Sequence, residues 1–127
     1  MHDDRRLVED RLSRALTTRV MPAIYQSAVP FAVEMWRVPD EPIPFAQAME
    51  EAEWEPFEIG DRWGAPWSTT WFRVTATVPE AWRDEHVEAV FDLGFEDAWP
   101  GNQAEALVYR LDGTPIKGLA PRNKHVP

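Results

Sequence analysis

The sequence predicts a mainly β protein, a sandwich or barrel of short strands that follows one N-terminal helix. From residue 31 onward, apolar and polar residues alternate in short segments, and turn-forming residues separate these segments at fairly regular intervals. This pattern is typical of small antiparallel folds. The 12 prolines and 6 glycines also favour short connections over long helices. A length of 127 residues with 44% hydrophobic residues fits one globular domain.

The one long helix that we expect covers residues 4–20. Starting at Val8, four apolar residues stand at positions i, i+4, i+7 and i+8 and so fall on one helical face. A preceding aspartate can cap the start, and Pro22 is expected to end the helix. Because the apolar face must cover something, we expect residues 1–22 to pack on a β-sandwich formed by residues 23–127.

Six short segments are predicted as strands, one of them only a brief stretch. Two end near prolines, Pro39 and Pro79, which cannot continue the hydrogen bonding of a sheet. The last two flank Asp112-Gly113, the strongest short-range signal for a hairpin. The predicted strands cover residues 31–36, 57–59, 71–78, 87–93, 107–111 and 114–117, and a short helix is expected over 45–52.

The polar segment at residues 120–127 is predicted to contain no strand. The count of strands is then five or six, below the roughly eight strands of a jelly roll. We therefore expect the sandwich to be truncated before its last strands.

Composition and charge disfavour several classes of function. The net charge of −9 disfavours nucleic acids and anionic membrane surfaces, which both attract clustered Lys and Arg. The chain has no cysteine, and therefore no disulfide, thiol chemistry or cysteine-ligated zinc. No apolar run is long enough for a membrane span, and the charged N-terminus differs from a signal peptide. We expect a cytoplasmic protein that binds neither nucleic acid nor membrane.

No residue pattern indicates a catalytic or metal centre. His2, His86 and His125 have no second ligand at a metal-binding spacing, so all three are expected to be exposed and inert. We interpret the carboxylates of residues 50–61 and Glu96-Asp97 as solvated loops rather than as a glycosidase pair, which needs two carboxyl groups across a cleft. Serine and glycine motifs for nucleophilic or nucleotide chemistry are absent. We expect no cofactor in this chain.

Seven tryptophans are unusual for 127 residues and predict large aromatics in the core, a ligand-binding face, or both. Trp71 and Trp82 bracket a strand and a turn, so we assign them to packing. Trp63, Trp67 and Trp99 lie on predicted loops, where an indole can stack on a sugar ring or fill a contact between domains. Packing is favoured over direct sugar contact for these three. The candidate sugar-binding or interdomain residues are Trp63, Trp67, Trp99, Asn102 and Glu105.

Three segments together resemble a known family. They are WGAPWSTTWFRVTATVPEAW at residues 63–82, VEAVFDLGFED at 87–97 and AEALVYRLDGTPIKGL at 104–119. In this order they are similar to the N-terminal β-sandwich domain of glycoside hydrolase family 38 α-mannosidases of the cytosolic and vacuolar type. In that family a Trp-Phe-Arg strand leads through Val-Pro and Trp to a hairpin with a glycine turn. Lys117 departs from the glutamine common in the family, and the loop at residues 98–101 also varies.

The resemblance implies a jelly-roll-like (galactose-binding-like) β-sandwich and a parent enzyme of mannose metabolism that hydrolyses terminal α-mannosides with retention. It also implies a carboxylate nucleophile, an acid/base and a divalent metal ion such as zinc, all in a later barrel domain. The chain is then a non-catalytic accessory domain, whose partners are its own catalytic domain, an α-mannoside and further copies of the parent. A free-standing carbohydrate-binding module is the alternative, and a small enzyme in its own right is the third hypothesis.

Overall fold

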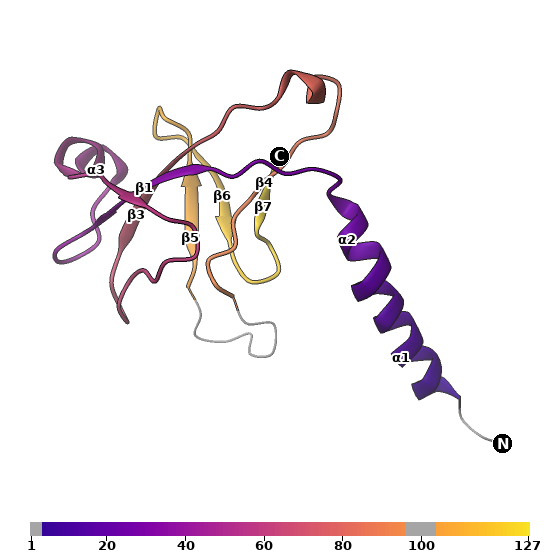
Figure 1. The fold of residues 1–127 in the computed structure, drawn as a ribbon. Helices are drawn as coiled ribbons and strands as arrows, with labels where there is room; N and C mark the ends of the chain where they lie inside the picture. Colours follow the sequence, from indigo (N-terminus) through magenta and orange to yellow (C-terminus); the bar gives the residue numbers. More distant parts are fainter. Residues whose placement is uncertain (1–3, 96–103) are drawn as a thin grey trace. The chain divides into compact units, whose positions relative to one another are not determined.

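The computed structural model describes residues 4–95 and 104–127, and the chain divides into two compact units, Met1–Phe31 and Ala32–Pro127. The first unit is helical and the second holds the strands (Figure 1). Among the described residues, every helix is too short or too polar to span a bilayer. The packing of the helix on the sandwich stays a prediction.

The helix of the first unit extends past its predicted end. It consists of α1 (Arg5–Ala15), a π-helical turn η1 (Leu16–Val20) and α2 (Met21–Ile24). The prediction that Pro22 ends the helix is wrong, because this proline sits in the first turn of α2, where its missing N–H is tolerated. The π-helical turn before it contains Thr17 and Thr18, whose hydroxyls donate to backbone carbonyls four residues earlier. Side-chain bonds of this kind accompany irregular helical turns.

The second unit is built on a three-stranded antiparallel sheet. Its strands are β1 (Ala32–Arg37), β2 (Glu55–Phe57) and β3 (Thr70–Thr75), in the order β2-β1-β3. β1 pairs with β3 along its whole length, with Met35 opposite Phe72 and Trp36 opposite Trp71. Because successive residues of a strand point to opposite faces, this sheet presents large apolar side chains on both faces.

Two further strand pairs complete the described part of this unit. β5 (Ala106–Tyr109) and β6 (Pro115–Leu119) form a hairpin, and β4 (Ala89–Val90) pairs with β7 (His125–Val126). Between the strands lie a short helix, α3 (Phe45–Glu51), and a 3-10 turn, η2 (Glu80–Trp82). The hairpin on Asp112-Gly113 and the helix near residue 45 are confirmed.

The other strand predictions are confirmed with altered spans. β3 ends at Thr75 rather than at residue 78, and β4 is confined to Ala89–Val90. β2 lies at Glu55–Phe57 rather than at residues 57–59. It includes Pro56, which the sheet tolerates because β2 is an edge strand and needs hydrogen bonds on one side only.

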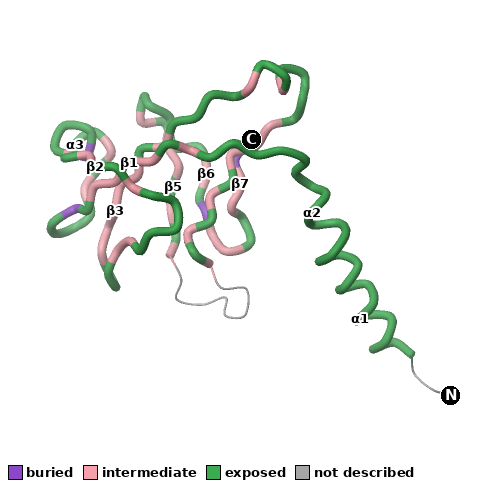
Figure 2. Tube along the Cα trace, viewed as in Figure 1, coloured by how far each residue is buried: buried purple, intermediate pink, exposed green. Residues whose placement is uncertain are grey.

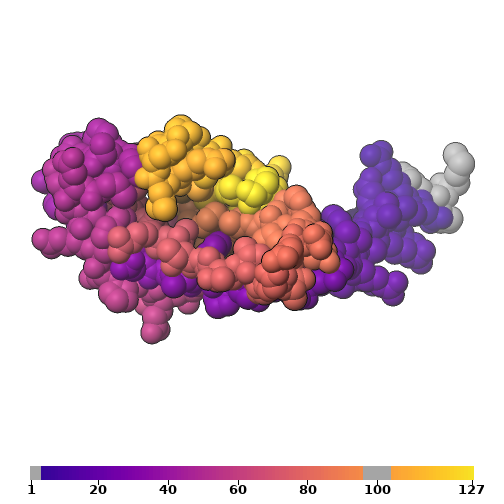
Figure 3. All heavy atoms as spheres, turned by 90° about the horizontal axis from the view of Figure 1, so that it is seen from above, coloured from indigo at the N-terminus to yellow at the C-terminus, as the bar shows by residue number. Residues whose placement is uncertain are grey.

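The prediction that residues 120–127 contain no strand is wrong. β7 pairs with β4 through Val126, which lies opposite Ala89 and is buried. His125, predicted to be exposed, is half-buried in this strand, and its carbonyl accepts a hydrogen bond of 2.7 Å from Lys117 Nζ. Two residues are too few to show a period in the sequence. In the space-filling view, the yellow C-terminal end of the chain lies beside the orange segments, in agreement with the contacts of β7 with β4 and β6 (Figure 3).

Each face of the three-stranded sheet supports an aromatic cluster. On one face Phe72 makes edge-to-face contacts with Phe57 and Trp63, with ring centroids 5.4 and 5.3 Å apart. We call this set the Phe72 cluster. Edge-to-face pairs of this kind add roughly 0.5–1.5 kcal/mol each beyond the area they bury.

The opposite face holds the Trp71 cluster, formed by Trp71, Phe45 and Tyr109. The three ring centroids lie 5.3 to 6.0 Å apart and come from β3, α3 and β5. The cluster therefore ties the hairpin and the short helix to the sheet. Buried residues are few along the described chain (Figure 2). The buried hydrophobic residues are Val38, Ala48, Leu119 and Val126.

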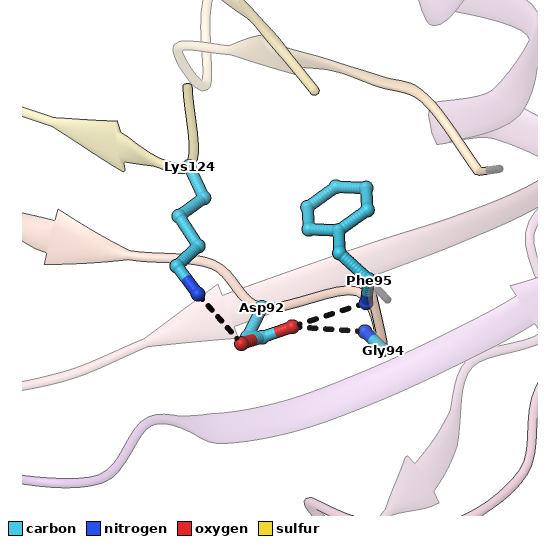
Figure 4. A network of polar contacts seen from close by, with 4 residues as sticks. All are labelled: Asp92, Gly94, Phe95 and Lys124. Carbon is cyan, nitrogen blue, oxygen red and sulfur yellow. Dashed lines mark hydrogen bonds and ion pairs between the residues drawn. The ribbon is translucent and has the colours of Figure 1, made fainter. Parts of the chain in front are cut away.

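A polar network fixes the segment after β4. Asp92 accepts hydrogen bonds from the backbone amides of Gly94 and Phe95 through Oδ1, and Lys124 Nζ donates to its Oδ2 at 2.9 Å (Figure 4). The Lys124 ammonium is the main cause of the lowered pKa of Asp92, and the two amides lower it further. The network links the β4 segment to the residue just before β7.

Replacing Gly113 tests the hairpin turn. Its φ is +86°, and an added Cβ would lie 2.9 Å from Cδ1 of Phe45. We expect Gly113→Ala to lower the free energy of unfolding by about 2–3 kcal/mol, from backbone strain and the contact together. Gly60→Ala is the matched control, because Gly60 has a φ of +104° and open space around it, so it should cost about 1 kcal/mol. Equal losses in urea denaturation would refute the role of the Phe45 contact.

Removing the Asp92 charge tests the polar network. Because folding lowers the pKa of Asp92, its contribution is present at neutral pH and is lost as the pH falls through the lowered value. We expect Asp92→Asn to cost about 0.5 kcal/mol at pH 7, a small value because both partners are part-exposed. The cost should vanish in acid. Lys124→Gln should cost the same, and the double variant no more; additive losses by thermal denaturation would contradict a direct pair.

Candidate functional site

The titratable side chains of the described residues form isolated pairs rather than a cluster of metal ligands. Within residues 4–95 and 104–127, no group of three or more His, Cys, Asp or Glu side chains is placed to hold a metal ion. The described carboxyls with a shifted pKa are Glu34, Asp92 and Asp112, and all three are shifted downward. A general acid needs the opposite shift, so that it holds its proton near neutral pH. These three carboxylates therefore act as hydrogen-bond acceptors.

The cross-strand pair of Glu34 and Arg73 is one polar arrangement on the sheet surface. Arg73 Nε donates to Glu34 Oε2 at 2.6 Å, and this bond is the main cause of the lowered pKa of Glu34. The Arg73 guanidinium also lies 4.8 Å from the ring centroid of Trp54, within cation–π range. The two contacts hold the Arg73 side chain in one orientation.

An open groove lies between the end of β3 and the hairpin. Its volume is about 730 Å³, within the range of roughly 300–1,000 Å³ of small-molecule sites in general. Two of its polar side chains are already engaged, since Arg73 pairs with Glu34 and Asp112 accepts from the backbone amide of Thr114 at 2.9 Å. The groove is lined by Arg73, Val74, Thr75, Tyr109, Arg110, Leu111 and Asp112.

Sequence reasoning missed this groove. Its lining comes from two segments that are far apart in the chain and meet only because the hairpin packs beside the sheet through the Trp71 cluster. No spacing within either segment signals that meeting. The groove is an open depression whose lining combines charged side chains with apolar ones such as Val74 and Leu111.

The tryptophans of the segment at residues 63–71 have three different environments. Trp63 is half-buried in the Phe72 cluster, and Trp71 belongs to the Trp71 cluster. The Trp71 indole Nε1 is buried without a hydrogen-bond partner, as is Thr70 Oγ1. Trp67, by contrast, is fully exposed. Of the two candidates in this segment, only Trp67 presents its indole to solvent.

Trp67 stands at a strained position of a tight turn. Its φ is +63°, and the Ser68 amide donates to the Ala65 carbonyl at 3.1 Å, which closes the turn around Pro66 and Trp67. Proline followed by a residue with positive φ is the arrangement of a type II turn, whose third position normally holds glycine. A bulky residue with positive φ is unusual and costs conformational energy.

The remaining candidates are placed as follows. Glu105 is exposed and immediately precedes β5. Trp99 and Asn102 lie outside the described residues. His86 is exposed, and its Nε2 lies 3.3 Å from Glu88 Oε1. The described candidates do not converge on a single site.

A comparison with protein families identifies the second unit. The family model of the α-mannosidase jelly roll domain matches residues 29–127. The chain belongs to this family. The match confirms the predicted jelly-roll fold and the predicted resemblance to an α-mannosidase β-sandwich domain.

Two curated proteins that this chain resembles are also named as α-mannosidases. Alpha-mannosidase 2C1 of Homo sapiens is 32% identical over 96 residues, which are 76% of this chain and 8% of the relative. Alpha-mannosidase 2C1 of Mus musculus is 33% identical over 79 residues, 62% of this chain and 6% of the relative. The chain thus spans less than a tenth of the length of these curated relatives.

Proposed function

We propose that this jelly roll domain is a non-catalytic accessory part of an α-mannosidase, and that the whole enzyme hydrolyses terminal α-mannosides with retention. The observation that carries the proposal is the match of residues 29–127 to the α-mannosidase jelly roll family. The contacts of Glu34, Asp92 and Asp112 are compatible with a structural role for these carboxylates, since they accept hydrogen bonds from Arg73, Lys124 and the Thr114 amide. The domain would pack on the catalytic domain and support its assembly.

The reaction chemistry then belongs to the catalytic domain. There the resemblance implies a carboxylate nucleophile, an acid/base and a divalent metal ion such as zinc. The described residues of this chain do not fit such an ion, because no three potential ligands converge. We assign the ion to the catalytic domain.

Location, family and assembly complete the proposal. The acidic, cysteine-free composition supports a cytoplasmic, reducing environment. The α-mannosidase match supports membership of glycoside hydrolase family 38. Further copies of the parent are a proposed partner, because most soluble oligomers are formed from identical chains.

A carbohydrate-binding module is the second candidate function. Two observations favour it, the groove of about 730 Å³ beside Tyr109 and the exposed indole of Trp67. A module of this kind binds sugar by itself, whereas an accessory domain acts only through the enzyme. Sugar binding by the isolated chain separates the two functions.

Incubation of the 127-residue chain with an aryl α-mannoside tests the non-catalytic role. We expect no release of the aryl alcohol above the buffer blank, with or without added zinc, because the proposal places the reacting groups in another domain. An authentic α-mannosidase in the same buffer is the positive control. Turnover by the chain at a rate proportional to its concentration would contradict the proposal.

Titration with mannose and mannobiose tests the binding-module alternative. We expect no saturable change in tryptophan fluorescence in the millimolar range. A saturable change would favour the module and overturn the ranking. Trp67→Gly and Arg110→Gln would then locate the sugar, since the first removes the exposed indole and the second alters the groove.

A further inference from the structure

We propose that Trp67 is the anchor through which this domain docks on the catalytic part of the α-mannosidase. The inference rests on the proposed function and deepens it, because it names the contact residue. Among the candidate residues for an interdomain contact, Trp67 is the one that would make it.

The position of Trp67 is unfavourable for the isolated domain. Its side chain is fully exposed, so packing within the described chain does not compensate for the positive φ of its backbone. Glycine would occupy the same turn position without strain. A strained residue that contributes nothing to its own domain is a candidate for a function outside it.

Hydrogen bonds between Ala65 and Ser68 fix the backbone of the turn that carries Trp67. The Ser68 hydroxyl accepts a hydrogen bond from the Ala65 amide and donates one to the Ala65 carbonyl, each at 2.7 Å. On one side of the turn Trp63 is packed in the Phe72 cluster, and on the other side β3 begins at Thr70. An exposed aromatic side chain on a preorganised turn loses little entropy when it is buried by a partner.

The surroundings of Trp67 favour a protein pocket over a sugar. Sugar and other small-ligand sites are concave and carry polar groups that bind the ligand. Trp67 is not among the residues that line the groove, and its neighbour Ser68 already uses its hydroxyl within the turn. A projecting indole preceded by the apolar residues Ala65 and Pro66 instead matches the aromatic anchors of protein interfaces, where Trp is enriched.

The length of the relatives supports the catalytic part as the partner. More than nine-tenths of human Alpha-mannosidase 2C1 lies outside the match to this chain. If this domain is joined to such a polypeptide, the partner is present at a high effective concentration, and a small contact centred on one indole suffices for docking.

Hydroxyl-radical footprinting with mass spectrometry tests the proposal. The rate of oxidation at Trp67 is compared between the 127-residue chain and the complete polypeptide of its reading frame. If that frame ends at Pro127, an α-mannosidase from the same genome is added at saturating concentration instead. We expect oxidation of Trp67 to fall at least tenfold in the larger assembly. Ile59, which is also exposed and lies outside the groove, is the control and should change less than twofold.

The outcomes separate this inference from the proposed function. Unchanged oxidation of Trp67, with protection elsewhere in residues 32–127, would overturn the anchor and leave the accessory role intact. No protection anywhere in these residues would overturn both. Protection of Trp67 by mannose or mannobiose in the 127-residue chain alone would instead make it a sugar platform.

A Trp67→Gly variant provides the second measurement. In the 127-residue chain its melting temperature should be no lower than that of the parent sequence, because glycine suits the turn. In the larger assembly, limited proteolysis should separate the domain at least tenfold faster than in the parent. An Ile59→Ser variant, at an exposed position outside the groove, should leave that rate unchanged. Equal proteolysis rates for Trp67→Gly and the parent would refute the anchor.

Discussion

The pairing of β1 with β3 is the constraint on which the second unit depends. It places Trp71 and Phe72 on opposite faces of one sheet, and each becomes the centre of an aromatic cluster. A shift of one residue in β3 would exchange the two faces, and both clusters would lose their central ring. The cross-strand bond between Glu34 and Arg73, on the same face as Trp71, supports the same register.

The sequence predicted those parts of the fold whose signal is local. The alternation around Val33 and the Asp112-Gly113 turn both act over a few residues, and both predictions are confirmed. The errors come from residues whose effect depends on a distant partner. Pro56 is compatible with a strand only because β2 lies at a sheet edge, and the strand at Val126 exists only because β4 lies beside it.

The environments of single tryptophans also depend on partners that are distant in the sequence. Trp63 and Trp67 lie in one predicted loop and have the same intrinsic chemistry. Trp63 is drawn into the core because the ring of Phe72 lies next to it, whereas Trp67 follows Pro66 at the exposed position of a turn. The proline is a usable signal in the sequence, since the residue after it in a type II turn must tolerate a positive φ. The groove beside Tyr109 has no such local signal.

The side chains of the second unit are only partly buried, which leaves apolar area that a neighbouring domain could cover. Among the described residues, the buried hydrophobic side chains are Val38, Ala48, Leu119 and Val126. Both aromatic clusters are built from rings that are only half-buried. Apolar burial supplies most of the favourable free energy of folding, at roughly 25 cal/mol per Å², so a domain with partly covered clusters has reserve area that a partner can bury. Binding a partner that prefers the folded state raises its stability. An accessory domain in a large enzyme obtains that partner from the same assembly, and an exposed indole on a rigid turn provides a defined point at which the contact can begin.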